Sequence, residues 1–118
     1  MELTEDIRRR LMAFQRLEIT EYHIYKRLAG TMNDPENRAL LEHIAADELR
    51  HYEDLKGYTG RQVNPNRFEM WFYYTVSRLL GLTFGIKLME MGEQKVQGNY
   101  VQLMGVVPEI ERWIEPDM

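Results

Sequence analysis

The sequence contains no cysteine among its 118 residues. This absence excludes disulfides, thiolate zinc sites, thiolate-bound iron clusters and cysteine nucleophiles within the chain. Any metal ion must therefore be bound by oxygen and imidazole ligands. Among such sites, carboxylates with a few imidazoles favour iron or manganese, although zinc would compete for the same ligands.

A long uninterrupted apolar segment is also lacking. The most apolar stretch, residues 71–91, is interrupted by Arg78 and Lys87 and is too mixed to span a bilayer. The N-terminal residues lack the apolar segment of a signal peptide. The net charge of −4 provides no excess of positive charge for nucleic acid. These features predict a soluble, cytoplasmic protein with no nucleic-acid partner.

The length and the apolar periodicity predict a single all-α domain over residues 1–118. No segment alternates as a strand would, whereas apolar side chains recur at steps of three or four residues. We expect three main helices, over residues 5–29, residues 35–58 and a long stretch from residue 67 to about residue 104. Gly81 or Gly85 would allow the third helix to kink.

Acidic residues lie on the apolar faces of all three predicted helices. Glu18 falls on the first face, Glu48 and His51 lie one turn apart on the second, and Glu93 lies on the third. A Glu-x-x-His pair alone is typical of a solvated helix face. Buried carboxylates, however, cost free energy unless they are paired or bind a metal. Glutamates from separate helices with a Glu-x-x-His pair are the ingredients of a carboxylate-bridged di-metal site.

Four neighbours of these residues are further candidates. Glu21 and Glu90 each lie one turn from a candidate ligand, and each either adds a ligand or flanks the site on its solvent side. Tyr25 and Tyr100 follow two of the candidate glutamates by seven residues. They either donate hydrogen bonds to the ligands, act as redox-active phenols, or are core tyrosines with a satisfied hydroxyl.

A weak internal repeat relates the two halves of the chain. The pattern around Glu18 recurs around Glu93, and in the first half it is followed by the Glu48 motif. The same spacing would place a second Glu-x-x-His motif about three residues beyond Met118. We therefore expect a helical bundle that is incomplete at the C-terminus of this chain.

The sequence resembles the ferritin-like superfamily, and specifically the rubrerythrin-type di-iron proteins. The resemblance covers nearly the whole chain, and the segment over residues 82–100 is most similar to the rubrerythrin-like domain fused to vacuolar-iron-transporter-type membrane proteins. The matching residues are Glu18, Tyr25, Ala29, Glu48, His51 and Glu93.

This resemblance implies an antiparallel four-helix bundle around two iron ions. Glu18 would be a terminal ligand, Glu48 a bridging carboxylate and His51 a nitrogen ligand. Glu93 would take the matching role on the third helix. Such sites bind two Fe(II) ions and react with oxygen or hydrogen peroxide, which predicts a ferroxidase- or peroxidase-type oxidoreductase.

The chain departs from the family in two respects. The fourth helix and its Glu-x-x-His motif are missing, so this helix is either truncated or supplied by another subunit, and a homodimer could pool partial sites. The cysteine cluster of rubredoxin type is also missing, which removes a built-in route for electrons. Two alternatives stay open: an iron-binding regulatory domain of a membrane iron transporter, and a metal-free helical oligomerisation module.

Overall fold

The computed structural model describes the backbone of residues 4–100 and the side chains of residues 4–91. This part of the chain forms four helices and no strand, which confirms the predicted all-α class. None of its helices combines the length and the apolar character needed to cross a bilayer. The helices are α1 (Glu5–Ala29), α2 (Pro35–Thr59), α3 (Arg67–Leu80) and α4 (Leu82–Tyr100).

The helices begin and end at residues suited to these positions. Thr4, Asp34 and Asn66 cap α1, α2 and α3, each accepting a hydrogen bond from a backbone N–H of the first turn. Pro35 occupies the first turn of α2, where its missing N–H costs nothing. Gly60 ends α2 with a φ of 67°, a conformation that favours glycine.

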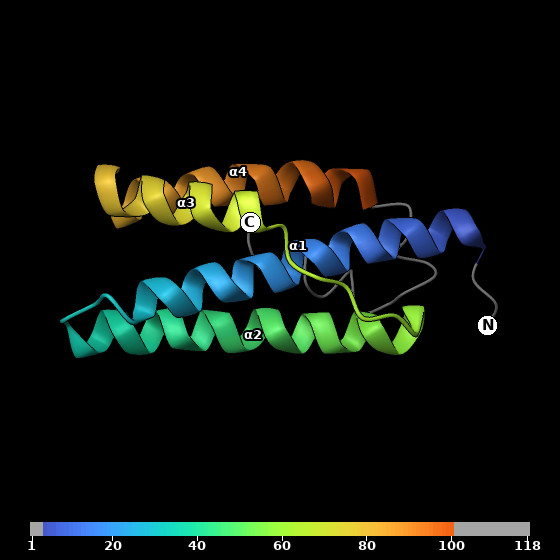
Figure 1. Cartoon of the computed structure of the whole chain (residues 1–118), viewed down its shortest axis with the longest axis horizontal. Helices are drawn as coiled ribbons and strands as arrows, with labels where there is room; N and C mark the ends of the chain where they lie inside the picture. Colours follow the sequence, from blue (N-terminus) through green and yellow to red (C-terminus); the bar gives the residue numbers. More distant parts are fainter. Residues whose placement is uncertain (1–3, 101–118) are drawn as a thin grey trace.

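Helix α1 is the central element of the fold. It lies between α2 on one side and the α3–α4 pair on the other, and α2 runs antiparallel to it (Figure 1). The main buried cluster joins α1 and α2, and α4 contributes one methionine to it. Its buried members are Ile24, Tyr25, Leu28, Ala29, Leu41, Ala45 and Met89.

The predicted third helix is two helices, because the chain reverses direction at Gly81. Helices α3 and α4 lie side by side as a hairpin (Figure 1). Gly81 has a φ of 106°, which side chains rarely tolerate. A Cβ at position 85 would overlap the side chain of Ser77, so the two helices approach closely at Gly85. The expected kink is therefore a full reversal, stabilised by contact between two small residues.

The connection between α2 and α3 is held by buried polar contacts. The Tyr52 hydroxyl accepts a hydrogen bond from the Val63 N–H at 3.0 Å and donates one to the Val63 carbonyl at 3.2 Å. Gln15 Nε2 donates to the Arg61 carbonyl at 2.7 Å. These contacts satisfy backbone groups of the loop and fix where α3 begins relative to α1.

Candidate metal centre

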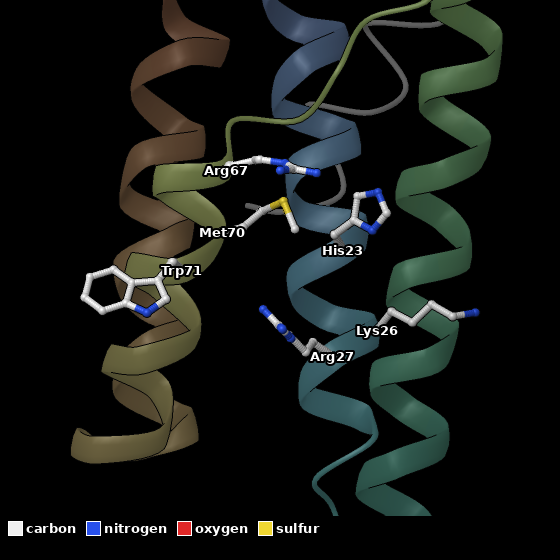
Figure 2. A pocket seen from close by; sticks show the side chains of 6 residues that line it. All are labelled: His23, Lys26, Arg27, Arg67, Met70 and Trp71. Carbon is white, nitrogen blue, oxygen red and sulfur yellow. The ribbon is translucent and has the colours of Figure 1, made fainter.

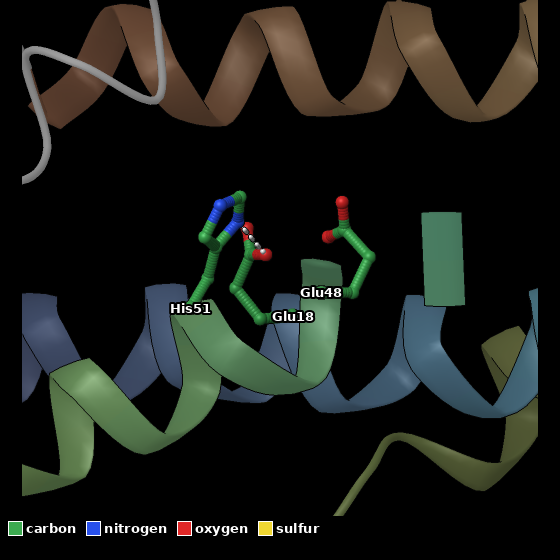
Figure 3. A group of neighbouring side chains, drawn as sticks. All are labelled: Glu18, Glu48 and His51. Atoms are coloured by element: carbon green, nitrogen blue, oxygen red, sulfur yellow. Dashed lines mark hydrogen bonds and ion pairs between the residues drawn. The ribbon is translucent and has the colours of Figure 1, made fainter. Parts of the chain in front are cut away.

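Three of the predicted ligands converge between α1 and α2. Glu18 comes from α1, and Glu48 and His51 come from adjacent turns of α2. One ligand atom of each lies within 4.8 Å of the others. Figure 3 shows the three side chains projecting to the same side, with the His51 ring facing the Glu18 carboxylate.

The packing of α1 on α2 explains this convergence. Along α1, buried Phe14 precedes Glu18 and buried Ile24 follows it. Along α2, buried Ala45 and Leu55 stand on either side of the Glu48 motif in the same way. In an antiparallel pair these apolar contacts align with one another, so the polar residues between them meet in a common layer.

Burial makes this polar layer costly in the metal-free protein. Glu18 is 1% exposed and Glu48 is 8% exposed. Glu48 Oε2 is buried and has no hydrogen-bond partner among the described residues. A buried acceptor without a partner costs about 1–3 kcal/mol, and more when it is charged. A cation bound at this oxygen would offset that cost.

His51 has the electrostatic character of a nitrogen ligand. Burial lowers the pKa of its imidazole below the ordinary value of 6.5, and Arg50 lowers this pKa further. Glu48 and two aspartates of α2 act in the opposite direction without reversing the shift. The metal-free imidazole is therefore neutral near pH 7 and offers a lone pair.

The contact between His51 and Glu18 fits two chemical states. His51 Nδ1 lies 3.1 Å from Glu18 Oε2, a hydrogen-bond distance in the metal-free protein. Two neighbouring ligands of one octahedral ion, each about 2.1 Å from it, would be about 3.0 Å apart. The two atoms therefore need little movement to bind the same ion.

The other predicted residues do not join this group. Glu21 is buried on α1 and Tyr25 is buried in the main apolar cluster, yet neither belongs to the three-residue group. Glu90 is exposed, so of the two places open to it the structure has the solvent side and not the inward face of α4. Met89 occupies that face, and one residue along a helix turns the side chain by about 100°.

The two predicted residues near the end of α4 lie outside the described side chains. The backbone of α4 includes positions 93 and 100. In Figure 3 the ribbon of α4 passes on the side toward which the three candidate ligands project. The roles of Glu93 as a ligand and of Tyr100 as its neighbour stay predictions.

Tyr73 of α3 is a partly buried tyrosine that packs against the main apolar cluster, and the sequence pattern does not indicate it. Burial raises the pKa of its phenol, and the charges of Glu69 and Glu21 raise it further. The effect of Glu21 on this phenol is electrostatic and acts between α1 and α3. No local signal reveals this, because the register of α3 on α1 depends on the loop over residues 60–66.

Comparisons with protein-family models, with curated proteins and with solved structures found no match for this chain. The chemical character of the site therefore rests on its own residues.

Proposed function

We propose that this protein is a ferritin-like, rubrerythrin-type di-iron protein that binds Fe(II) and oxidises it with oxygen or hydrogen peroxide. The observation that carries the proposal is the buried group of Glu18, Glu48 and His51. Carboxylate and imidazole ligands without a thiolate suit iron and manganese. The motif resemblance of the sequence supports iron and oxidation chemistry specifically.

Each residue of the group has a distinct proposed task. Glu18 would hold one ion as a terminal ligand, and His51 would hold an ion through nitrogen. Glu48 would be the bridging carboxylate that the family resemblance implies, and a bound ion would give its buried Oε2 the partner it lacks. Ferrous ions held here would supply the redox chemistry: oxidation of two Fe(II) to Fe(III) would release two electrons, which with two protons would reduce oxygen to hydrogen peroxide or hydrogen peroxide to two waters. The protein holds the ligands in a buried layer and limits access of water.

We infer that a pair of ions requires ligands beyond these three. Glu93 of the same chain and the equivalent residues of a second copy would supply them. Exposed apolar side chains on α3 and α4 support a homodimer, because such surface is commonly covered by a partner. These side chains are Phe68, Trp71, Phe72, Leu79, Leu80, Phe84 and Met91.

Iron retention tests the site directly. The wild-type protein, loaded with Fe(II) without oxygen and then desalted, should keep about one iron or more per chain. The double variant Glu48→Ala/His51→Ala should keep almost none. The matched control is His43→Ala/Glu53→Ala, which removes the same residue types from exposed positions of α2. Plasma mass spectrometry measures the metal, and equal retention by both double variants would sink the assignment.

A second candidate function is iron binding without turnover, as a regulatory domain of a membrane iron transporter. The likeness of residues 82–100 to such fused domains favours it. Retained Fe(II) that neither oxygen nor hydrogen peroxide oxidises faster than in buffer alone would support this candidate and contradict the oxidase. A membrane segment directly downstream in the coding sequence would point the same way.

The metal-free oligomerisation module makes a different prediction. A ligand that binds only the folded state raises the melting temperature. A dimer whose melting temperature does not respond to Fe(II) would therefore favour this module over both iron-binding functions.

A further inference from the structure

A basic groove of about 500 Å³ lies between α1 and α3. It is lined by His23, Lys26 and Arg27 of α1 and by Arg67, Met70 and Trp71 of α3. Figure 2 shows the guanidinium groups of Arg27 and Arg67 in the space between the two helices, whereas Lys26 extends away from it. No acidic residue lines the groove, although the whole chain carries a net charge of −4.

The two arginines have no carboxylate to neutralise them in the described part of the chain. Neither Arg27 nor Arg67 forms a salt bridge there. Their own helices offer none, because no Asp or Glu lies three or four residues before or after either arginine. The arginines that do form such pairs are Arg8, Arg10, Arg38 and Arg50.

Arg27 is held in place without losing its charge. Its Cζ lies 5.0 Å from the centroid of the Tyr74 ring, a cation–π contact between α1 and α3. Such a contact restrains the guanidinium but leaves its N–H groups able to donate hydrogen bonds at their edges. A guanidinium fixed in this way is well prepared to bind an oxyanion through two parallel hydrogen bonds.

Arg67 stands where a cation is unfavourable for the helix itself. It is the first residue of α3, at the positive end of the helix dipole. Arg27, in the last turn of α1, is at a favourable end, so helix stability explains Arg27 but not Arg67. An anion between them would be attracted by both guanidinium groups and by the N-terminus of α3.

We propose that the Arg27–Arg67 groove is a binding site for a small phosphate-bearing anion. Each arginine donates hydrogen bonds to phosphate oxygens, and Met70 forms an apolar part of the wall. Because its ligand contacts both α1 and α3, the site also holds α3 against α1. The inference does not depend on the proposed iron function, because Glu18, Glu48 and His51 do not line the groove.

Calorimetric titration of the metal-free protein with inorganic pyrophosphate at low salt tests this site. The variant Arg27→Gln/Arg67→Gln should bind about tenfold more weakly or worse, because two charge-assisted contacts are lost. The control Arg38→Gln/Arg78→Gln removes the same charge from outside the groove and should stay within about twofold of the wild type. The His23 ring resonances should shift with pyrophosphate in the wild type and in the control only.

Vesicles of phosphatidylcholine with and without phosphatidylglycerol distinguish a lipid phosphate from a soluble one. The site is supported if pyrophosphate or the phosphatidylglycerol vesicles bind and this binding requires Arg27 and Arg67. The probe that binds then shows whether the phosphate group belongs to a soluble anion or to a lipid. The proposal is overturned if neither probe binds, or if Arg27→Gln/Arg67→Gln and the control Arg38→Gln/Arg78→Gln weaken binding equally. Should the glutamine variant fail to fold, Arg27→Lys/Arg67→Lys keeps the charge but loses the paired hydrogen bonds, and unchanged affinity would then contradict the proposal.

Discussion

At the scale of single residues, Glu48 is the most informative side chain of the described chain. Its Oε2 is buried without a hydrogen-bond partner, whereas Glu18 contacts His51. An acceptor left in this state reduces stability, and proteins retain such groups chiefly where binding requires them. Glu48 thus lowers the stability of the metal-free fold, and the proposed binding of a cation would remove this loss.

Replacing Glu48 by glutamine should separate stability from metal binding. The change Glu48→Gln keeps the shape and removes a buried charge, so the free energy of unfolding of the metal-free protein should rise by about 1 kcal/mol. The rise in melting temperature caused by Fe(II) should disappear. Glu53→Gln, at an exposed position of α2, should alter neither quantity appreciably. Chemical denaturation and thermal melting measure both, and a Glu48→Gln protein that Fe(II) still stabilises would contradict the ligand role.

The pKa of His51 predicts how the stability of the metal-free protein depends on pH. Burial lowers this pKa in the folded state below the ordinary value of 6.5, so below that pH the unfolded chain binds more protons at this residue. The contribution is present above pH 6.5 and is lost as pH falls toward the folded pKa. The wild type should therefore lose more stability than His51→Gln between neutral and mildly acidic pH. Denaturation at several pH values checks this, and parallel losses in the two proteins would refute it.

At the scale of elements, the hairpin of α3 and α4 depends on its glycines. Gly85 faces Ser77 so closely that a methyl group at position 85 has no room. Gly57, within α2, has open space around its Cβ position. The same substitution at these two sites should therefore have opposite effects.

Gly85→Ala should lower the free energy of unfolding by about 1–3 kcal/mol, as overpacking does. Gly57→Ala should raise it by about 0.5–1 kcal/mol, because alanine favours a helix over glycine. Urea denaturation followed by circular dichroism measures both changes. Equal effects at the two positions would mean that α3 and α4 do not pack as the structure has them.

Helix boundaries were predictable from sequence because their causes are local. Thr4 and Asp34 cap their helices through hydrogen bonds that reach only two or three residues along the chain. The reversal at Gly81 was not predictable in the same way. A glycine permits a kink and a reversal alike, and only the contact of Gly85 with Ser77 distinguishes them.

At the scale of the whole molecule, the exposed apolar side chains of α3 and α4 are the feature that favours the proposed homodimer. Phe68 is 71% exposed and Leu79 is 77% exposed, and both belong to the set of apolar residues described above. Surface of this kind is uncommon on a monomer. A second copy that covers it is the proposed source of the further ligands that a pair of ions needs.

A charged residue on this face should therefore dissociate the proposed homodimer. Sedimentation of the wild type should give the mass of two chains. The variant Leu79→Glu should sediment closer to the mass of a single chain, and it should retain less iron than the wild type. Ala13→Glu, at an exposed position of α1, serves as the control and should leave both unchanged. The proposed interface would be contradicted by a wild type that sediments as a single chain, or by a Leu79→Glu variant that still sediments as a dimer.

The sequence by itself determined the ends and the buried faces of α1 and α2, and the pairing of Glu48 with His51 one turn apart. These properties depend on residues within a few positions of one another, which helix geometry relates directly. Only the tertiary structure decided that His51 lies 3.1 Å from Glu18, that Glu90 is exposed, and that the chain reverses after Leu80. The Arg27–Arg67 groove also belongs to this second class. Contacts between distant segments depend on helix register, and register arises from side-chain packing and loop hydrogen bonds across the whole fold.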